Sequence, residues 1–388
     1  MNPINHMRML GLRSLVLESS DGLRITGFAL ITWNNAWKAL EALGIADSIR
    51  RRHLPLDGIR VSSAVTGLPI LEKSFERKGQ DGNYETRCVI RKILLETLKE
   101  ELPHGTIKYS SKVVSIEESG WFKIVHLGDG SSIKTKVLIG CDGVNSVVAK
   151  WLGLKKAVDA GRSAIRALVE FPEGHGFERK FLQCIGHGVR YGYMPCNEKT
   201  MYWFFTFTSL DQKTEDDMED NPAKMKQFVL SKLGKLSQQV QSVVERTELV
   251  NISCASLKLR WPWDLLRGES CRGNVCVAGD ALHPMTPDIG QGGCSALEDG
   301  VVLARCLGEA FLAKTQNGDE WGRIEKAVEK YGKERRWRSI GLIATAYTVG
   351  MVQQSDGKVM SFLRDNLLAG ILAGSLLKMA DFDCGKLN

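Results

Sequence analysis

The sequence has no apolar stretch that reaches the roughly 18 residues needed for a membrane-spanning helix. Its best candidate, residues 367–377 (LLAGILAGSLL), is too short, and we interpret it as a C-terminal helix packed on the body of the protein rather than as a membrane-surface anchor. The N-terminal residues MNPINHMRML lack the apolar run of a secretory signal. No long Lys/Arg block carries the net charge of +7, so nucleic-acid binding is not indicated.

The cysteines also lack the patterns that build disulfide or metal frameworks. The ten cysteines form no CxxC pair, and the seven histidines do not cluster with them at ligand spacing. We therefore expect reduced, mostly buried thiols, no metal site and a cytosol-like compartment. A composition of 43% hydrophobic and 25% charged residues is typical of a globular protein and excludes a mainly disordered chain.

What the sequence does contain is an alternation of short apolar runs with amphipathic segments. The runs at 13–18, 136–140 and 274–278 are typical of buried parallel strands. Helices are predicted over 34–43, 89–101, 295–312 and 321–337, and a polar helical region over 211–245. Strands are predicted at 107–116, 121–126, 163–171 and 188–208, with residues 186–192 forming a hairpin rather than a phosphate loop. This order predicts a nucleotide-binding α/β domain interrupted by a sheet domain, with a ligand between them.

The strongest motif is GDALHPMTPDIGQG at residues 279–292, which lies between a predicted strand and a predicted helix. That layout is typical of a ligand site at the carboxyl end of a parallel sheet. Gly290 and Gly292 would let the backbone approach a ligand closely, and Asp280 suits a sugar-like hydroxyl. The next helix would offer free N–H groups to an anionic or carbonyl-rich group. A plain turn with a helix cap is the alternative, which the density of aspartate, histidine, proline and glycine in the segment disfavours.

A second motif is IGCDGVNS at residues 139–146, again a strand followed by a glycine turn. Ser146 would cap the helix that follows. Alone, an Asp-Gly turn is usually structural.

Together the two motifs resemble those of the class A FAD-dependent monooxygenases, the para-hydroxybenzoate-hydroxylase-like group. Residues 27–44, 87–98 and 331–338 are similar to the plant salicylate-hydroxylase-like and zeaxanthin-epoxidase-like branch. The resemblance implies FAD as cofactor and NADH or NADPH as electron donor. It further implies that a flavin C4a-hydroperoxide transfers one oxygen atom from O2 to a hydrophobic or aromatic small molecule.

By position, the resemblance also implies residue roles. Glu18 would accept from the adenosine ribose with Arg24 nearby, and Arg91 would donate to the FAD phosphates, although a surface ion pair is the alternative for Glu18 and Arg91. The other implied cofactor-binding residues are Asp142, Gly143, Gly279, Asp280, Pro287, Gly290, Gln291 and Gly292. No catalytic side chain is required; His283 is a weak candidate base, weighed against a structural role in its loop. The residues expected to line the substrate site are Arg190, Tyr191, Tyr193 and the strand at residues 202–207, of which Trp203 and Phe205 are singled out.

One expected part of this family is missing from the sequence. The family begins with a strand, a Gly-x-Gly-x-x-Gly loop and a helix that together hold the pyrophosphate, and no such sequence precedes Glu18. Residues 6–11 (HMRMLG) resemble the end of that helix. We therefore expect weak or absent flavin binding, and the activity of this shortened chain is in question. The alternatives are a non-catalytic relative that acts in binding or regulation, and a flavin-dependent isoprenoid reductase.

The expected architecture is an α/β fold with an N-terminally incomplete, Rossmann-like FAD-binding domain, an inserted β-sheet substrate domain and C-terminal helices. The FAD-binding domain would comprise residues 1–60, 85–160 and 270–345, and the substrate domain residues 61–84 and 161–269. Residues 346–388 would form a C-terminal helical segment. The expected location is cytoplasmic, without a transmembrane segment; a plastid location and peripheral membrane contact stay open.

Overall fold

The computed structural model describes residues 13–23, 27–64, 67–75, 78–79, 82–186, 188–208, 221–233, 238–312, 319–354 and 377–387. Arg24, residues 6–11 and all but the last residue of the predicted helix 367–377 lie outside this part of the chain. None of the helices described is both long and apolar enough to cross a membrane.

The α/β part contains two parallel strand pairs. Strand β1 (Val16–Leu17) pairs with β8 (Ile107–Lys108), and β12 (Leu138–Gly140) pairs with β19 (Val275–Val277). The three short apolar runs therefore form parallel strands as predicted, although each strand is shorter than its run. Only β19 is fully buried as expected; both residues of β1 and the first two of β12 are half-buried. Within the described residues the two pairs belong to separate sheets.

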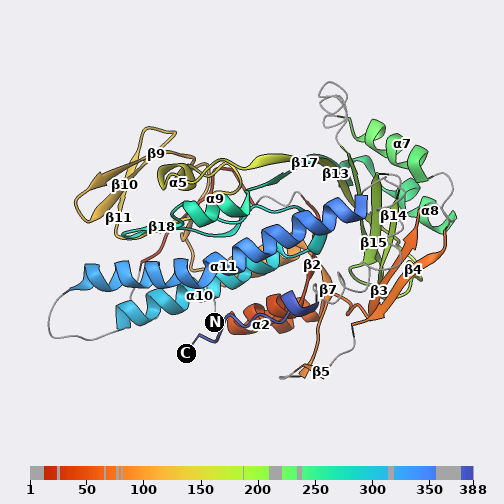
Figure 1. The fold of residues 1–388 in the computed structure, drawn as a ribbon, viewed down its shortest axis with the longest axis horizontal. Coiled ribbons are helices and arrows are strands. Elements are labelled where there is room, and N and C mark those ends of the chain that lie inside the picture. Colours follow the sequence, from red (N-terminus) through yellow and green to blue (C-terminus); the bar gives the residue numbers. More distant parts are fainter. Residues whose placement is uncertain are drawn as a thin grey trace.

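Two long helices support the second of these pairs. Helix α10 (Gly292–Leu312) and helix α11 (Glu320–Gln354) lie side by side (Figure 1), and α2 (Asn34–Ala42) packs on α10. Their contact faces bury large apolar side chains, among them Trp37, Leu40 and Tyr331. Burial of this kind is the main source of helix stability in a folded protein. Helix α11 continues well past the predicted end, so the expected domain boundary at residue 345 falls inside a helix.

The other large element is a seven-stranded sheet in the order β17-β13-β16-β15-β14-β3-β4, called here the large sheet. Its strands are β3 (Gly58–Ser63), β4 (Pro69–Ser74), β13 (Val158–Glu170), β14 (Lys180–Gly186), β15 (Val189–Pro195), β16 (Thr200–Thr208) and β17 (Ile252–Leu259). Only the β14–β3 pair is parallel. The β14–β15 hairpin confirms the prediction for the glycine-rich residues 186–192.

The two faces of the large sheet have different partners. Helices α7 (Pro222–Leu233) and α8 (Gln238–Arg246) cover the outer face (Figure 1) and pack against its aromatic side chains. The inner face packs against β2 (Ala29–Thr32) and the start of α2. Successive residues of a strand point to opposite faces, so each strand contributes side chains to both environments.

The remaining elements are small. They are α3 (Ala46–Arg50), β5 (Lys78–Gly79), β6 (Gly82–Asn83), β7 (Arg87–Ile90), α4 (Arg91–Glu100), β9 (Val113–Ser119), β10 (Phe122–Leu127), β11 (Ser132–Thr135), α5 (Val147–Trp151), α9 (Pro262–Arg267) and β18 (Cys271–Arg272). The strand predicted at 107–116 is split, because Ser110 adopts a left-handed φ of 51° between β8 and β9. The helix predicted at 89–101 starts later, because Val89 pairs in β7.

Candidate functional site

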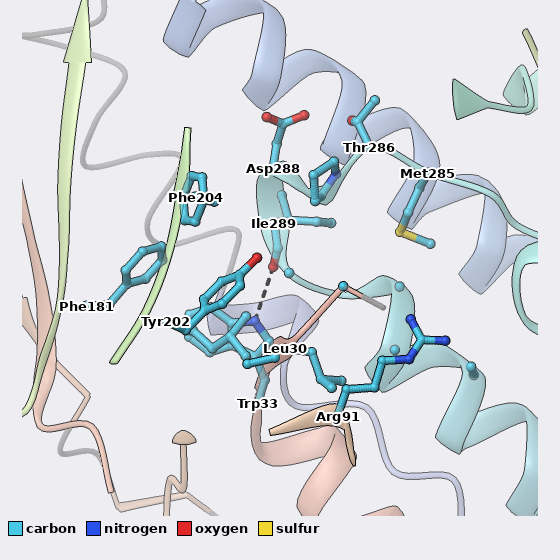
Figure 2. Close-up of a pocket in the computed structure, with 18 of the residues that line it drawn as sticks. Leu30, Trp33, Arg91, Phe181, Tyr202, Phe204, Met285, Thr286, Asp288 and Ile289 are labelled. Atoms are coloured by element: carbon cyan, nitrogen blue, oxygen red, sulfur yellow. Dashed lines mark hydrogen bonds between the residues drawn. The ribbon is translucent and has the colours of Figure 1, made fainter. Parts of the chain in front are cut away.

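A cavity of about 730 Å³ lies between the glycine-rich loop at residues 279–293 and the inner face of the large sheet (Figure 2). This volume is within the range of small-molecule binding sites, roughly 300–1,000 Å³. The loop borders one side, Phe181, Tyr202 and Phe204 border the opposite side, and Arg91 at the start of α4 borders a third.

Bare backbone forms much of the loop side of the cavity. Gly143, Gly279 and Gly290 adopt left-handed φ angles of 77°, 58° and 63°. A Cβ atom added at Gly143 or Gly300 would meet no other atom within 4 Å, so these glycines border open space. Helix α10 begins at Gly292 beside the cavity and has no acidic residue in its first turn, which leaves its N-terminus favourable for an anionic or carbonyl-rich group.

The loop is held against β2 by close packing. A Cβ atom at Gly290 would lie 2.2 Å from Cγ2 of Ile31, so only glycine fits this position. Nε1 of Trp33 donates to the carbonyl oxygen of Ile289 at 3.2 Å (Figure 2). These contacts hold the loop in place at the edge of the cavity.

A buried ionic network connects the loop to helices α10 and α11. The carboxylate of Asp299 on α10 accepts from the backbone N–H of Gly279 at 2.7 Å, from Nε2 of His283 at 2.8 Å and from Nε of Arg335 at 2.6 Å. Burial alone would raise the pKa of Asp299, but His283 and Arg335 more than offset it and place the pKa at about 2. Arg335 also pairs with Glu298 at 2.7 Å, so both acids have a cationic partner.

His283 belongs to this network and not to the cavity. Its side chain is fully buried, and it is absent from the residues that line the cavity. This placement agrees with the structural role that was the alternative to a catalytic base.

A second buried network joins the loop to the large sheet. Arg162 on β13 donates to both carboxylate oxygens of Asp288, at 3.0 and 2.7 Å, and Arg190 on β15 donates to one of them at 3.1 Å. Gln354 at the end of α11 accepts from Arg162 at 2.6 Å. Burial lowers the pKa of Arg190, although the neighbouring Asp288 acts in the opposite direction.

The predicted cofactor-binding residues divide into two groups. Those that line the cavity are Arg91, Gly143, Gly279, Asp280, Pro287, Gly290 and Gly292. Glu18, Asp142 and Gln291 do not line it. The side chain of Glu18 accepts from the backbone N–H of Ser20 at 2.9 Å at the end of β1.

Asp142 and Gln291 have structural partners. The carboxylate of Asp142 accepts from the backbone N–H of Val147 at 2.6 Å, at the start of α5, and Oγ of Ser146 accepts from Ala149 at 2.8 Å. The predicted Ser146 cap is thereby confirmed. Gln291 accepts from Nδ2 of Asn35 at 2.8 Å and so ties the loop to α2.

Of the residues singled out as substrate-lining, only Arg190 lies at the cavity. Tyr191, Tyr193, Trp203 and Phe205 lie on the outer face of the large sheet, in the core formed with α7 and α8. The strands were therefore assigned correctly, but these four side chains point away from the cavity. The cause is the twofold alternation of a strand: their neighbours point inward.

The structure adds several cavity residues that the sequence analysis did not select. They are Arg166, Phe181, Gln183, Met194, Thr286 and Asp288. Tyr202 and Phe204, which belong to the strand expected to face the substrate, also line the cavity. Thr286 and Asp288 lie within the strongest motif, which could have drawn attention to them. The sheet residues carry no motif, and only the alternation relative to Arg190 could have indicated them.

The residues at the cavity fit a flavin dinucleotide. A glycine-bordered loop, a helix N-terminus without acids and the guanidinium of Arg91 provide donors and space for a carbonyl-rich ring and an anionic tail. Thr286 and Gln183 each have a buried polar atom without a hydrogen-bond partner among the residues described, as expected beside a ligand site.

This fold and site define an enzyme of the class A FAD-dependent monooxygenases, a class that comparison with known proteins supports. The sequence profile of the FAD binding domain family matches residues 5–338, and the chain belongs to this family.

Individual relatives agree with this assignment. Monooxygenase 2 of Arabidopsis thaliana is 55% identical over 388 residues, covering 98% of this chain and 94% of that protein. Monooxygenase 1 of the same plant is 34% identical over 384 residues, covering 97% and 94%. The crystal structure of Klebsiella pneumoniae HpxO complexed with FAD and uric acid has a TM-score of 0.78 at 22% identity, covering 97% of this chain and 92% of that one. At this identity the structural likeness concerns the fold.

Proposed function

We propose that the enzyme takes electrons from NADH or NADPH and inserts one oxygen atom from O2 into a hydrophobic or aromatic small molecule. The observation that carries the proposal is the cavity that is bounded by the glycine-rich loop on one side and by aromatic side chains of the large sheet on the other. When bound, the flavin supplies the redox and oxygen chemistry. The protein supplies orientation and an apolar enclosure that limits access of water.

Several residues would hold the cofactor. Arg91 would bind phosphate oxygens through its forked donors. Asp280, which borders the cavity and is exposed, would accept from hydroxyls of the ribityl chain or lie near the pyrophosphate. Pro287, Gly290 and Gly292 would border the isoalloxazine ring.

The other predicted contacts include three residues that do not line the cavity, Glu18, Asp142 and Gln291. Glu18 would accept from the adenosine ribose at the end of β1. Gly143 would border the flavin and the nicotinamide nucleotide, while Asp142 would act by keeping the start of α5 in place. Gln291 would act by fixing the loop to α2.

The test is a direct assay of the purified 388-residue chain with FAD in excess. Bound flavin is measured by absorbance, and NADH or NADPH oxidation is measured together with O2 uptake and peroxide release. The expected result is nucleotide oxidation that an aromatic substrate stimulates, with a product heavier by one oxygen atom. A folded chain without flavin would favour the non-catalytic relative, and turnover without O2 would favour the reductase.

A matched pair of variants tests the cofactor site. Arg91→Gln is expected to weaken FAD binding about 10- to 100-fold, the effect of losing one or two charged hydrogen bonds. Lys92→Gln removes the same charge one residue along α4, where the side chain is 59% exposed, and is expected to leave the affinity unchanged. Equal FAD affinities for the two variants would argue against the assigned role of Arg91.

A further inference from the structure

The inner face of the large sheet carries an aromatic floor made by Phe181, Tyr202 and Phe204. Gly192 on β15 is paired with Phe204 on β16, and a Cβ atom at Gly192 would lie 2.5 Å from Cζ of Phe204. The missing side chain thus lets the Phe204 ring lie across the neighbouring strand. The ring centroids of Phe181 and Tyr202 are 6.1 and 6.3 Å from that of Phe204. The result is an apolar surface suited to a flat ring system.

Arg166 stands beside this floor. It occupies the position on β13 that pairs directly with Phe204, and it lines the cavity. Among the residues that the structure describes, its guanidinium group has no hydrogen-bond partner and no ion pair with an acid. A half-buried guanidinium has five donors to satisfy, so an unpartnered one at a cavity wall is available to a ligand.

The surroundings do not neutralise this charge. The cationic residues that line the cavity are Lys73, Arg91, Arg166 and Arg190, and the acidic ones are Asp280 and Asp288. Asp288 is already bound by Arg162 and Arg190, at 2.7 and 3.1 Å. The single negative charge of Asp288 is therefore shared by two guanidinium groups. This part of the cavity has a net positive charge even without Arg166, and Arg166 adds to it.

We propose that Arg166 binds an anionic group of the substrate, a carboxylate or an equivalent oxyanion, while the apolar ring of the substrate lies on the floor of Phe181, Tyr202 and Phe204. A guanidinium matches a carboxylate with two parallel hydrogen bonds, and partial burial strengthens the attraction. This substrate assignment rests on the proposed function, because oxidation of the bound molecule requires the monooxygenase activity. Binding itself requires neither reduced flavin nor O2.

The hydroxyl of Tyr202 is consistent with this assignment. Burial raises the pKa of Tyr202 to about 12, although Arg166 acts in the opposite direction. The hydroxyl therefore stays protonated at neutral pH and can donate to the same oxyanion. The raised pKa of Tyr202 is consistent with the anion-binding role that the position of Arg166 at the cavity indicates.

The test compares two ligands of the same shape and different charge, 2-naphthoate and 2-naphthamide. Their dissociation constants are measured by isothermal titration calorimetry with the full chain, with and without added FAD. The wild-type chain is expected to prefer the carboxylate by about 10- to 100-fold. Arg166→Gln should abolish that preference and leave naphthamide binding unchanged, and Arg166→Lys should restore part of it.

Arg267→Gln is the matched control, because Arg267 is an exposed arginine on α9, outside the cavity. It should keep the full preference for the carboxylate. Thermal unfolding of each variant verifies that it is folded. Equal binding of the two ligands by the wild-type chain, undetectable naphthoate binding at millimolar concentration, or a preference that survives in Arg166→Gln would each overturn the proposal. Carboxylate binding that depends on Arg166 without any O2 uptake would instead contradict the proposed function alone.

Discussion

Replacing Gly290 by alanine tests how the glycine-rich loop is held against β2. Gly290 has a left-handed φ of 63°, which costs an alanine about 1–2 kcal/mol. Its Cβ atom would also lie 2.2 Å from Cγ2 of Ile31 and 3.1 Å from Nε1 of Trp33, and overpacking of this kind costs about 1–3 kcal/mol. The two contributions together predict a loss of about 2–5 kcal/mol in the free energy of unfolding.

Guanidinium unfolding followed by circular dichroism measures this loss as a lower transition midpoint. Gly341→Ala is the matched control, because Gly341 lies in α11, where its added Cβ atom would meet nothing within 4 Å. A glycine in a helix destabilises it by about 0.5–1 kcal/mol relative to alanine, so this variant is expected to be slightly more stable. If Gly290→Ala unfolds at the wild-type midpoint, the loop is not held by the contact that the structure shows.

Three further predictions concern the sheet, the buried network and the α5 cap. Gly192→Ala should displace the Phe204 ring from its place across β15, so calorimetry should show weaker binding of flat aromatic ligands, and overpacking should lower the stability by about 1–3 kcal/mol. Asp299→Asn should cost about 3–5 kcal/mol at neutral pH, because Arg335 and His283 lose a buried carboxylate. The pKa of Asp299 is lowered to about 2 in the folded chain, so the stabilisation by its carboxylate is complete above the ordinary aspartate pKa of about 3.9. The difference in unfolding free energy between wild type and Asp299→Asn should therefore shrink as the pH falls from about 3.9 towards about 2. Ser146→Ala should cost about 1–2 kcal/mol and speed hydrogen exchange in α5, and unchanged exchange would contradict the cap.

The sequence was most informative where local chemistry restricts the backbone. The glycine and proline pattern at 279–292 predicted a loop between a strand and a helix, and the structure has that loop at the cavity. Ser146 predicted a helix cap because a hydroxyl before a helix has few other uses. Such features depend on neighbours within a few residues, so a single sequence can reveal them.

Residues 201–208 (MYWFFTFT) show the opposite case. All but the last of them are buried, so no alternation of polar and apolar side chains indicates which face points inward. The contacts of Asp288 were equally hidden, because its partners Arg162 and Arg190 lie 126 and 98 residues away in the sequence. The extent of α11 could not be predicted either, since its C-terminal part is fixed by packing on the loop and the large sheet.

The network around Asp288 has a consequence for the evolution and redesign of this enzyme. Asp288 belongs to the glycine-rich loop on one side of the cavity, whereas its partners Arg162 and Arg190 belong to strands of the large sheet on the other side. A substitution at either arginine leaves a buried carboxylate short of a partner and therefore also perturbs the loop. Changes in substrate range that pass through these positions should be strongly epistatic, and so should changes at Phe204, whose ring lies 4.9 Å from the guanidinium carbon of Arg190. New specificities should be easier to reach through Phe181, which makes no ion pair or cation–π contact with the network among the described residues.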